Sequence, residues 1–442
     1  MDAELGPWEV VEQLATLVDR SLVLAEGGAS PRYRLLETAR LFALERLREA
    51  GEEDRLRERH ARALDEWLTV RRQDARLWRT PPAPPQALVA ELDNARAALA
   101  WAQDHADDGL VLRLAAGASH VFLTAALNAE YLERVLPLRG RVRADTPAEL
   151  AGRFWSRIAF AAGRNGHAAG LEAGHRAIAA WRALGDEGLL YDALTWTIAI
   201  GARQGRVEEA QALIEEGERI ERDAWPPALR SSFRWAKHRW LQLQGRADEA
   251  LACARQQAEL LAQAGVWVMH VAWGANVADC EISLGRPAEA EAHARAALEA
   301  LDGLGVDENI VGHVMDALVV ALVQLGRGDE AMPVARRARR LLAREGDDLR
   351  LLEPLAAAAG ARGQWDVAAR LAGHVDAAIA QSGETRWPSA VQRRAQLQEG
   401  LDRALPAAAQ RELMRAGASM TRDEAFALAL DDPPMPGKPA PR

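Results

Sequence analysis

The chain has 442 residues and a formal net charge of −9; 49% of its residues are apolar and 27% are charged. This composition is typical of a folded protein in water. The negative charge disfavours a general affinity for nucleic acid or for an anionic membrane. The sequence has no apolar run long enough to span a bilayer, only two cysteines and no signal-peptide pattern. We therefore expect a cytoplasmic protein without disulfide bonds or membrane contact.

The first fifty residues predict a mixed arrangement of elements. Residues 8–18 have helical periodicity, and two short strand-like runs at 22–25 and 32–35 flank a turn-rich loop. Residues 36–50 return to a helical pattern that ends at a glycine. Helix, hairpin and helix in this order predict the last part of a winged helix, which we assign to residues 1–52.

Proline and composition divide the remainder of the chain. Proline cannot continue a helix, so the Pro-rich run that begins at Pro81 ends the helical pattern before it. The Pro-rich C-terminus has too few apolar residues to form a core. We predict a connecting helix at 53–80, a Pro-rich linker at 81–86, helices with degenerate repeats at 87–164, regular repeats at 165–382, a helical cap at 383–430 and a disordered tail at 431–442.

A repeated turn is the most informative feature of the sequence. Glycine is followed five positions later by alanine in five copies, and successive glycines are 40, 40, 41 and 37 residues apart. The pairs are Gly205 and Ala210, Gly245 and Ala250, Gly285 and Ala290, Gly326 and Ala331, and Gly363 and Ala368. A period in this range with helical periodicity indicates stacked helix pairs. Glycine would end one helix in a left-handed conformation, and alanine would leave room for the neighbouring helix.

Other positions of the repeat also have structural explanations. Glutamate occurs four residues after the glycine in four copies, where a carboxylate suits the positive end of a helix dipole. An uncharged residue lies five positions before each glycine, on a stripe that a neighbouring repeat would bury. These residues are Ile200, Trp240, Cys280, Ala321 and Ala358. No element of the repeat requires catalysis.

The turn, Gly-x-x-x-Glu-Ala, resembles the tetratricopeptide repeat lengthened to about 40 residues. We therefore expect an all-α fold, a tetratricopeptide-like α-solenoid of helix pairs, with a small partial winged helix and its one β-hairpin at the N-terminus. A repeat of this length resembles the sensor region of large bacterial signal-transducing (STAND) ATPase-type transcriptional regulators, the maltose-activator class and its relatives. Further segments resemble the same family: 17–23, 32–40 and 43–47 its winged helix, 91–101 a signature before its repeats, and 417–430 its C-terminal segment.

The sequence departs from this family in one important respect. Such regulators carry a phosphate-binding loop, Gly-x-x-x-x-Gly-Lys-Ser/Thr. The chain has only two lysines, Lys237 and Lys438, and neither lies in such a loop. We therefore expect no ATP binding and no cofactor for this chain alone. In the family the winged helix packs against the ATPase, so the resemblance implies no direct nucleic-acid binding. It implies instead a protein partner or ATPase module, with a small-molecule inducer as a further candidate.

No motif in the sequence indicates an enzyme. The ten histidines are scattered, with no His-Glu-x-x-His motif and no paired Cys-x-x-Cys for a metal. Residues 117–120 lack the Gly-x-Ser-x-Gly pattern of a serine nucleophile. Cys253 and Cys280 fall at interior positions of the repeat and suit buried small residues better than nucleophiles. We expect no catalytic, metal-binding or cofactor-binding residues.

Two groups of residues are candidates for binding. Tryptophan is enriched at binding hot spots, and four tryptophans are candidates to line a ligand groove, although the same residues could fill the core: Trp235, Trp240, Trp267 and Trp273. The densest basic helix is by default an exposed solvated face, and the alternative is a charged contact for an acidic partner. Its candidate residues are Arg336, Arg337 and Arg340.

Two functions from different classes remain open. The preferred hypothesis is a ligand- or protein-sensing scaffold module of an ATPase-type transcriptional regulator, acting through protein–protein interaction. A ligand would act by binding one conformation better than another. The alternative is a stand-alone tetratricopeptide-like adaptor that binds peptide segments of a partner protein, with no ATPase involved.

Overall fold

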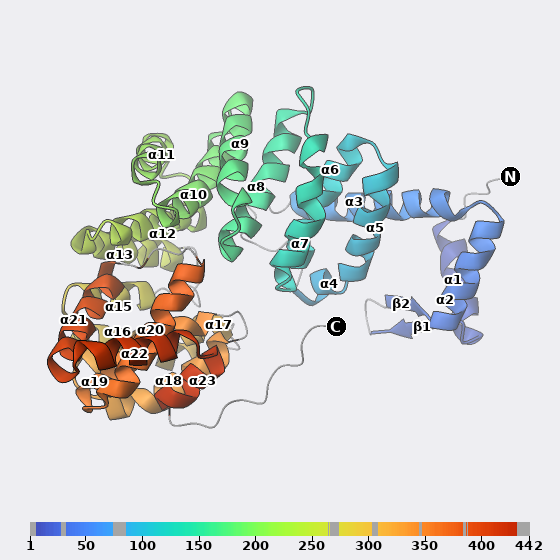
Figure 1. Cartoon of the computed structure of the whole chain (residues 1–442). Helices are drawn as coiled ribbons and strands as arrows, with labels where there is room; N and C mark the ends of the chain where they lie inside the picture. The colour runs from blue at the N-terminus through green and yellow to red at the C-terminus, as the bar shows by residue number, and fades with distance from the viewer. Residues whose placement is uncertain are drawn as a thin grey trace. The chain divides into compact units, whose positions relative to one another are not determined.

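The computed structural model describes residues 6–27, 32–73, 85–263, 265, 274–302, 308–343, 347–382, 386 and 388–430. The predicted tail at 431–442 and most of the predicted linker lie outside these residues. The chain divides into two compact units, one of residues 1–76 and 81–144 and the other of residues 77–80 and 145–442 (Figure 1). None of the helices in the described ranges is sufficiently long and apolar to cross a bilayer.

The first unit begins with the predicted helix, hairpin and helix. Strand β1 (Val23–Glu26) pairs antiparallel with β2 (Arg32–Leu35), and Val23 lies opposite Leu35. The sequence-based prediction of one β-hairpin is confirmed. The helices of the unit are α1 (Pro7–Asp19), α2 (Glu37–Glu49), α3 (Glu53–Gln73), α4 (Pro85–Val89), α5 (Leu92–His105), α6 (Asp108–Thr124), α7 (Asn128–Val135) and the 3-10 helix η1 (Leu136–Arg141).

Ion pairs join distant parts of the first unit. Arg32 of β2 donates to the Glu91 carboxylate and to the Ala90 carbonyl, each at 2.7 Å, which ties the hairpin to the start of α5. Arg96 of α5 forms a bidentate pair with Glu130 of α7 at 2.7 Å, a geometry that fixes both partners. Segment 91–101 therefore has a structural role in this unit.

The second unit consists of helices. The first half contains α8 (Ala148–Asn165), α9 (Ala169–Leu184), α10 (Glu187–Arg203), α11 (Val207–Ile220), α12 (Pro227–Leu243), α13 (Ala247–Gln263), α15 (Gly274–Ser283) and α16 (Pro287–Leu301). The second half contains α17 (Glu308–Gln324), α18 (Gly328–Leu342), η2 (Asp347–Leu351), α19 (Leu352–Ala361), α20 (Trp365–Ser382), α21 (Pro388–Ala404), α22 (Ala407–Ala418) and α23 (Arg422–Leu430). Helices adjacent in the chain pack as pairs, so the all-α, tetratricopeptide-like solenoid is confirmed.

The repeated turn has the same geometry in every copy. All five turn glycines have a left-handed backbone, with φ between 69° (Gly245) and 78° (Gly363). The residue after each glycine donates its N–H to the carbonyl five positions earlier, as Arg246 does to Leu241 at 3.0 Å. This hydrogen bond is the Schellman closure of a helix. The alanine five positions after each glycine is at most 1% exposed, because the facing helix leaves no room for a larger side chain.

Helices α20 and α22 approach more closely than any side chain would allow. A Cβ atom added at Gly373 would lie 2.1 Å from the Met414 carbonyl oxygen, and one at Gly417 would lie 1.9 Å from the Arg370 carbonyl oxygen. Both clashes are with backbone, which cannot move aside as a flexible side chain can. The two glycines therefore set the distance between these helices.

We predict that Gly373→Ala and Gly417→Ala each lower the free energy of unfolding by at least ~3 kcal/mol, because the helices must separate. Urea unfolding followed by circular dichroism measures the change. Gly328→Ala is the matched control, because its Cβ would meet only Ala358 at an ordinary 3.6 Å. A loss below ~1 kcal/mol at Gly373 or Gly417 would show that the crossing is looser than described.

His238 lies buried in α12, with an exposed fraction of 0%. Its Nδ1 donates to the Ala250 carbonyl at 3.0 Å, while its Nε2 has no hydrogen-bond partner among the described residues. Burial lowers the pKa of His238 to about 4, because the charged imidazolium would lose its hydration. The native state therefore holds this histidine neutral.

This neutral histidine predicts acid sensitivity. The unfolded chain binds a proton at this residue near pH 6.5 but the folded chain does not until about pH 4, so the contribution of His238 to stability is constant above about 6.5 and falls below it. Between pH 7 and 4.5, the free energy of unfolding should fall by about 2.5 kcal/mol more in the wild type than in His238→Asn. Urea unfolding at both pH values measures this difference. Parallel losses in the two proteins would contradict the prediction.

Candidate functional site

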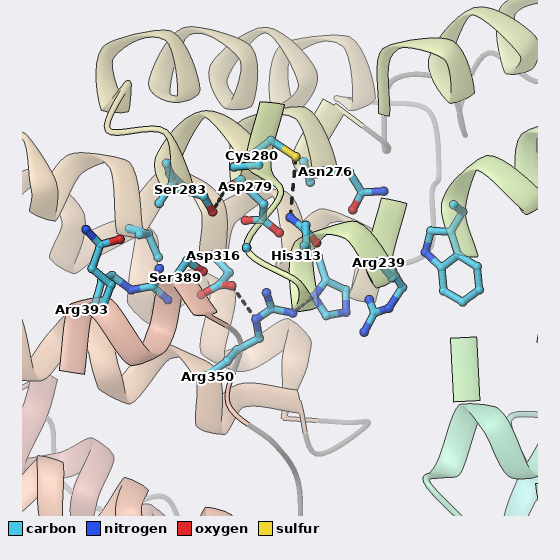
Figure 2. Close-up of a pocket in the computed structure, with 18 of the residues that line it drawn as sticks. Arg239, Asn276, Asp279, Cys280, Ser283, His313, Asp316, Arg350, Ser389 and Arg393 are labelled. Atoms are coloured by element: carbon cyan, nitrogen blue, oxygen red, sulfur yellow. Dashed lines mark hydrogen bonds and ion pairs between the residues drawn. The ribbon is translucent and has the colours of Figure 1, made fainter. Parts of the chain in front are cut away.

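The second unit contains a pocket on one side of its repeats. The pocket has a volume of about 400 Å³ and is lined mainly by side chains of α12, α15, α17, η2 and α21. Figure 2 shows Arg239 and Arg393 at opposite ends, with Asp279 and Asp316 between them. The cavity thus carries positive groups at its two ends and negative groups in its middle, and its volume is of the size that binds small ligands.

The repeat places side chains in this pocket by a simple rule. Residues six and ten positions before a turn glycine are one helical turn apart, and therefore share a helix face. In three consecutive repeats both positions line the pocket. They are Trp235 and Arg239 before Gly245, Ala275 and Asp279 before Gly285, and Asp316 and Val320 before Gly326. The residue that directly follows the position six before the glycine is the buried, uncharged residue of the repeat, which is Trp240, Cys280 or Ala321.

A chain of polar contacts crosses the middle of the pocket. Arg350 Nε donates to Asp316 Oδ2 at 2.6 Å, and Arg350 Nη1 lies 3.0 Å from His313 Nδ1. Because arginine can only donate, His313 Nδ1 accepts here and the proton of the neutral ring lies on Nε2. That nitrogen is 3.5 Å from Asp347 Oδ2. The contacts fix the η2 side chain of Arg350 against α17.

Burial shifts the pKa values of two charged residues in the pocket, Arg239 of α12 and Asp279 of α15. Burial, together with the guanidinium groups of Arg203 and Arg350, lowers the pKa of Arg239 to about 10. Burial also raises the pKa of Asp279, in spite of the opposing effect of Arg350. The Asp279 and Asp347 carboxylates oppose the shift at Arg239, so burial is the main effect that disfavours the charged form of both Arg239 and Asp279.

The structure places the four predicted tryptophans differently. Trp235 is half-buried and lines the pocket, with the Arg239 guanidinium 5.6 Å from its ring centroid. Trp240 is 4% exposed, does not line the pocket and donates its indole N–H to the Val207 carbonyl at 3.3 Å. It belongs to the core, because its position is on the buried stripe. Trp267 and Trp273 lie outside the described residues.

The predicted basic helix is α18, and part of it binds the chain's own C-terminal helix. Arg336 donates to the Leu430 carbonyl at the end of α23 at 2.5 Å, so this guanidinium contacts the C-terminal helix of its own chain. Arg339, which was not a candidate, pairs with Asp423 at 2.6 Å and lies 4.3 Å from the Phe426 ring centroid. Arg337 and Arg340 are exposed.

A second candidate surface lies on the first unit. Eleven large hydrophobic side chains are exposed between positions 8 and 42, on α1, the hairpin and α2, with Trp8 at 85% and Phe42 at 60%. In the rest of the described chain such side chains are exposed only at Val89, Leu184 and Val391. Helix α2 has no buried residue. An exposed apolar surface of this extent is typical of an interaction site, and we call residues 8–42 the apolar face.

Groups suited to metal or nucleophilic chemistry do not gather in the described residues. No set of three His, Cys, Asp or Glu side chains there could hold a metal ion. Both cysteines are buried and free. Burial raises the pKa of Cys253 to about 11 and also raises that of Cys280, so each thiol stays protonated near neutral pH.

Sequence relatives are regulators, but the similarity is local. No protein-family model matches the chain. Over 130 residues it is 38% identical to provisionally named HTH-type transcriptional regulators of Mycobacterium bovis and Mycobacterium tuberculosis. The match covers 28% of this chain and 14% of each relative, so the chain spans a small part of their length.

Solved structures show the same fold. A Rap protein complexed with Competence and Sporulation Factor aligns with a TM-score of 0.52 and 14% identity, covering 80% of this chain and 98% of that one. A signal-transduction ATPase (STAND) protein with a tetratricopeptide repeat sensor, from Pyrococcus horikoshii, aligns with a TM-score of 0.51 and 16% identity. That alignment covers 91% of this chain and 60% of the other. The chain thus has the helical fold of regulatory sensor proteins.

Sequence reasoning missed most of the pocket. The six-before and ten-before positions could have been found from the turn glycines alone, because they recur on one helix face at a fixed spacing from each glycine. Two of them, Arg239 and Asp279, carry opposite charges in adjacent repeats. The contributions of Arg350 and Arg393 carried no comparable signal, since neither residue lies six or ten positions before a turn glycine.

The pair of Arg350 and Asp316 offers a direct test of the pocket's geometry. Asp316 is 3% exposed, so removal of its partner leaves a buried carboxylate uncompensated. We predict that Arg350→Met lowers the free energy of unfolding by about 2 kcal/mol, and that adding Asp316→Asn restores about 1 kcal/mol. Urea unfolding of the single and double variants measures both effects. Arg340→Met, at an exposed site of α18, is the control; equal losses at 340 and 350 would contradict the pairing.

Proposed function

We propose that this chain is the sensing and scaffold region of an ATPase-type transcriptional regulator. It would lack a phosphate-binding loop of its own and act on a separate ATPase module through protein–protein contact. In this proposal the pocket receives the signal and the apolar face transmits it. The chain itself would perform no catalysis, bind no cofactor and make no direct contact with nucleic acid.

The apolar face carries this proposal. Residues 8–27 and 32–42 belong to α1, the hairpin and α2, their large apolar side chains are mostly exposed, and of these described residues only Val23 is buried. Removing such side chains from water stabilises a complex by about 25 cal/mol for each Å² buried. A protein surface that completes this small domain is the occupant that its apolar chemistry fits. The resemblance of 17–23, 32–40 and 43–47 to the end of a winged helix supports an ATPase module as that occupant.

The second unit supports a sensing role. Its fold is that of the STAND protein with a tetratricopeptide repeat sensor, although the likeness concerns the fold alone. The local identity to transcriptional regulators points in the same direction. A ligand in the pocket would contact α12, α15, α17 and η2 at once. It could therefore favour one arrangement of these helices over another, which is what a sensor requires.

The test begins with the DNA on both sides of the coding region. The proposal predicts a neighbouring or continuous frame that encodes Gly-x-x-x-x-Gly-Lys-Ser/Thr, and its product should form a complex with this chain on gel filtration. Phe42→Asp should weaken that complex at least about tenfold, because a charge replaces an exposed apolar contact. Titration of the two purified proteins measures the dissociation constant.

Val391→Asp provides the matched control, since Val391 is similarly exposed but lies on α21. Both variants should keep the thermal stability of the wild type, because neither side chain is buried. A complex that forms equally well with Phe42→Asp would contradict the role of the apolar face. The absence of any such frame beside the gene would favour a stand-alone adaptor instead.

A further inference from the structure

We infer that the pocket of the second unit binds a small primary amine with one positive charge and an apolar body. Its ammonium group would bind the Asp279 carboxylate of α15, between the side chains of Asn276 and Ser283. This inference rests on the proposed sensing function and names what is sensed. No contact with Arg239 or with the apolar face is required.

The Asp279 carboxylate lines the cavity without a direct partner. It accepts no hydrogen bond and forms no ion pair within the part of the chain that the structure describes, although its backbone carbonyl accepts from Ser283 at 2.8 Å. Burial raises the pKa of Asp279, while the guanidinium groups of Arg350 and Arg393 act in the opposite direction. A cation in direct contact would therefore stabilise an ionised carboxylate that burial disfavours.

The two guanidinium groups that act on Asp279 already face other carboxylates. Arg350 Nε donates to Asp316 Oδ2 at 2.6 Å, and Arg393 Nη2 lies 3.9 Å from Glu353 Oε2. These carboxylates offset part of the repulsion that the two guanidinium groups would exert on an ammonium ion. Because Coulomb energy falls with distance, a direct contact with Asp279 outweighs the repulsion that remains.

Further oxygen atoms flank Asp279 on the same face of α15. Asn276 lies one helical turn before Asp279, Ser283 lies one turn after it, and all three line the pocket (Figure 2). The Nδ2 atom of Asn276 is buried, so its amide oxygen is the atom that can face a ligand. Ser283 Oγ donates to the Asp279 carbonyl and retains lone pairs for another donor. An ammonium group has three N–H donors and no acceptor, which suits this row of oxygens.

The rest of the cavity suits an apolar body without a second charge. Ile282, Ile310 and Val320 form an aliphatic part of its wall, and its volume of about 400 Å³ accommodates a small ligand. Guanidinium groups lie at the two ends of the cavity, on Arg239 and Arg393. A second ammonium group would approach one of these ends and be repelled. The pocket therefore favours a monoamine over a diamine.

The experiment measures binding of matched probes to the full chain by isothermal titration calorimetry. The amines are hexylamine and phenylethylamine, and their neutral counterparts are hexanol and phenylethanol. The diamine is diaminohexane, which adds a second positive charge to hexylamine. We expect at least one amine to bind, its alcohol to bind at least about tenfold more weakly, and the diamine to bind more weakly than that amine.

Variants locate the site. Asp279→Asn should weaken the bound amine at least about tenfold, and Asn276→Leu at least about threefold, because each removes an acceptor for the ammonium group. Asp302→Asn, at an exposed position, is the matched control and should leave binding unchanged. Asp279→Asn removes a charge that burial disfavours, so its melting temperature should not fall below that of the wild type. If Asn276→Leu does not fold, the alcohols still test recognition of the ammonium group on the wild-type chain.

Four outcomes would overturn the ligand class. They are no binding by either amine, equal binding by an amine and its alcohol, undiminished binding by folded Asp279→Asn, or a lower melting temperature of Asp279→Asn, which would reveal a partner within the chain. Each can be separated from failure of the proposed function, because the complex through the apolar face is measured independently. If that complex forms and no amine binds, only the ligand class is wrong.

Discussion

The left-handed turn between paired helices is the constraint on which the second unit depends. A glycine with φ near 70° ends one helix, and a fully buried alanine five residues later lets the next helix pack against its neighbours. Because the turn repeats, it fixes both the position and the rotation of each helix that ends at a turn glycine, such as α12, α15 and α17. The same rotation that buries the stripe residue Trp240 turns its neighbour Arg239 into the pocket. The residue spacing that buries the core positions of the repeat therefore also determines which side chains line the pocket.

The 3-10 helix η2 links the pocket to the C-terminal cap. Arg350 and Asp347 contact α17 from one side of this short segment. Asp348, between them, is 3% exposed and accepts from Arg422 of α23 at 3.0 Å. The cap is further held by Arg339 of α18. A ligand that displaced Arg350 would therefore act on η2, which also contacts the C-terminal cap through Asp348. A change in the pocket could in this way alter the packing of the cap.

The fold could be predicted from the sequence to a greater extent than the site. Glycine and alanine at fixed spacing have one structural meaning, so the helix pairs followed from Gly205 and its repeats. The hairpin followed from alternating strand-like runs beside turn residues. The site depends on which way each polar side chain faces and on positions that the repeated turn does not mark, such as Arg350 and Arg393. Tryptophan alone was an unreliable guide: Trp235 lines the pocket, whereas Trp240 fills the core.

The central claim is that the positions six and ten residues before the turn glycines form a binding site for a small molecule. Hydrogen–deuterium exchange of the full chain, with and without the dialysable fraction of a bacterial cell extract, tests it most directly. The account predicts slower exchange in segments 235–242, 275–283 and 310–320, which line the pocket, and unchanged exchange in α9. Unchanged exchange in all three segments, or protection confined to other helices, would contradict it.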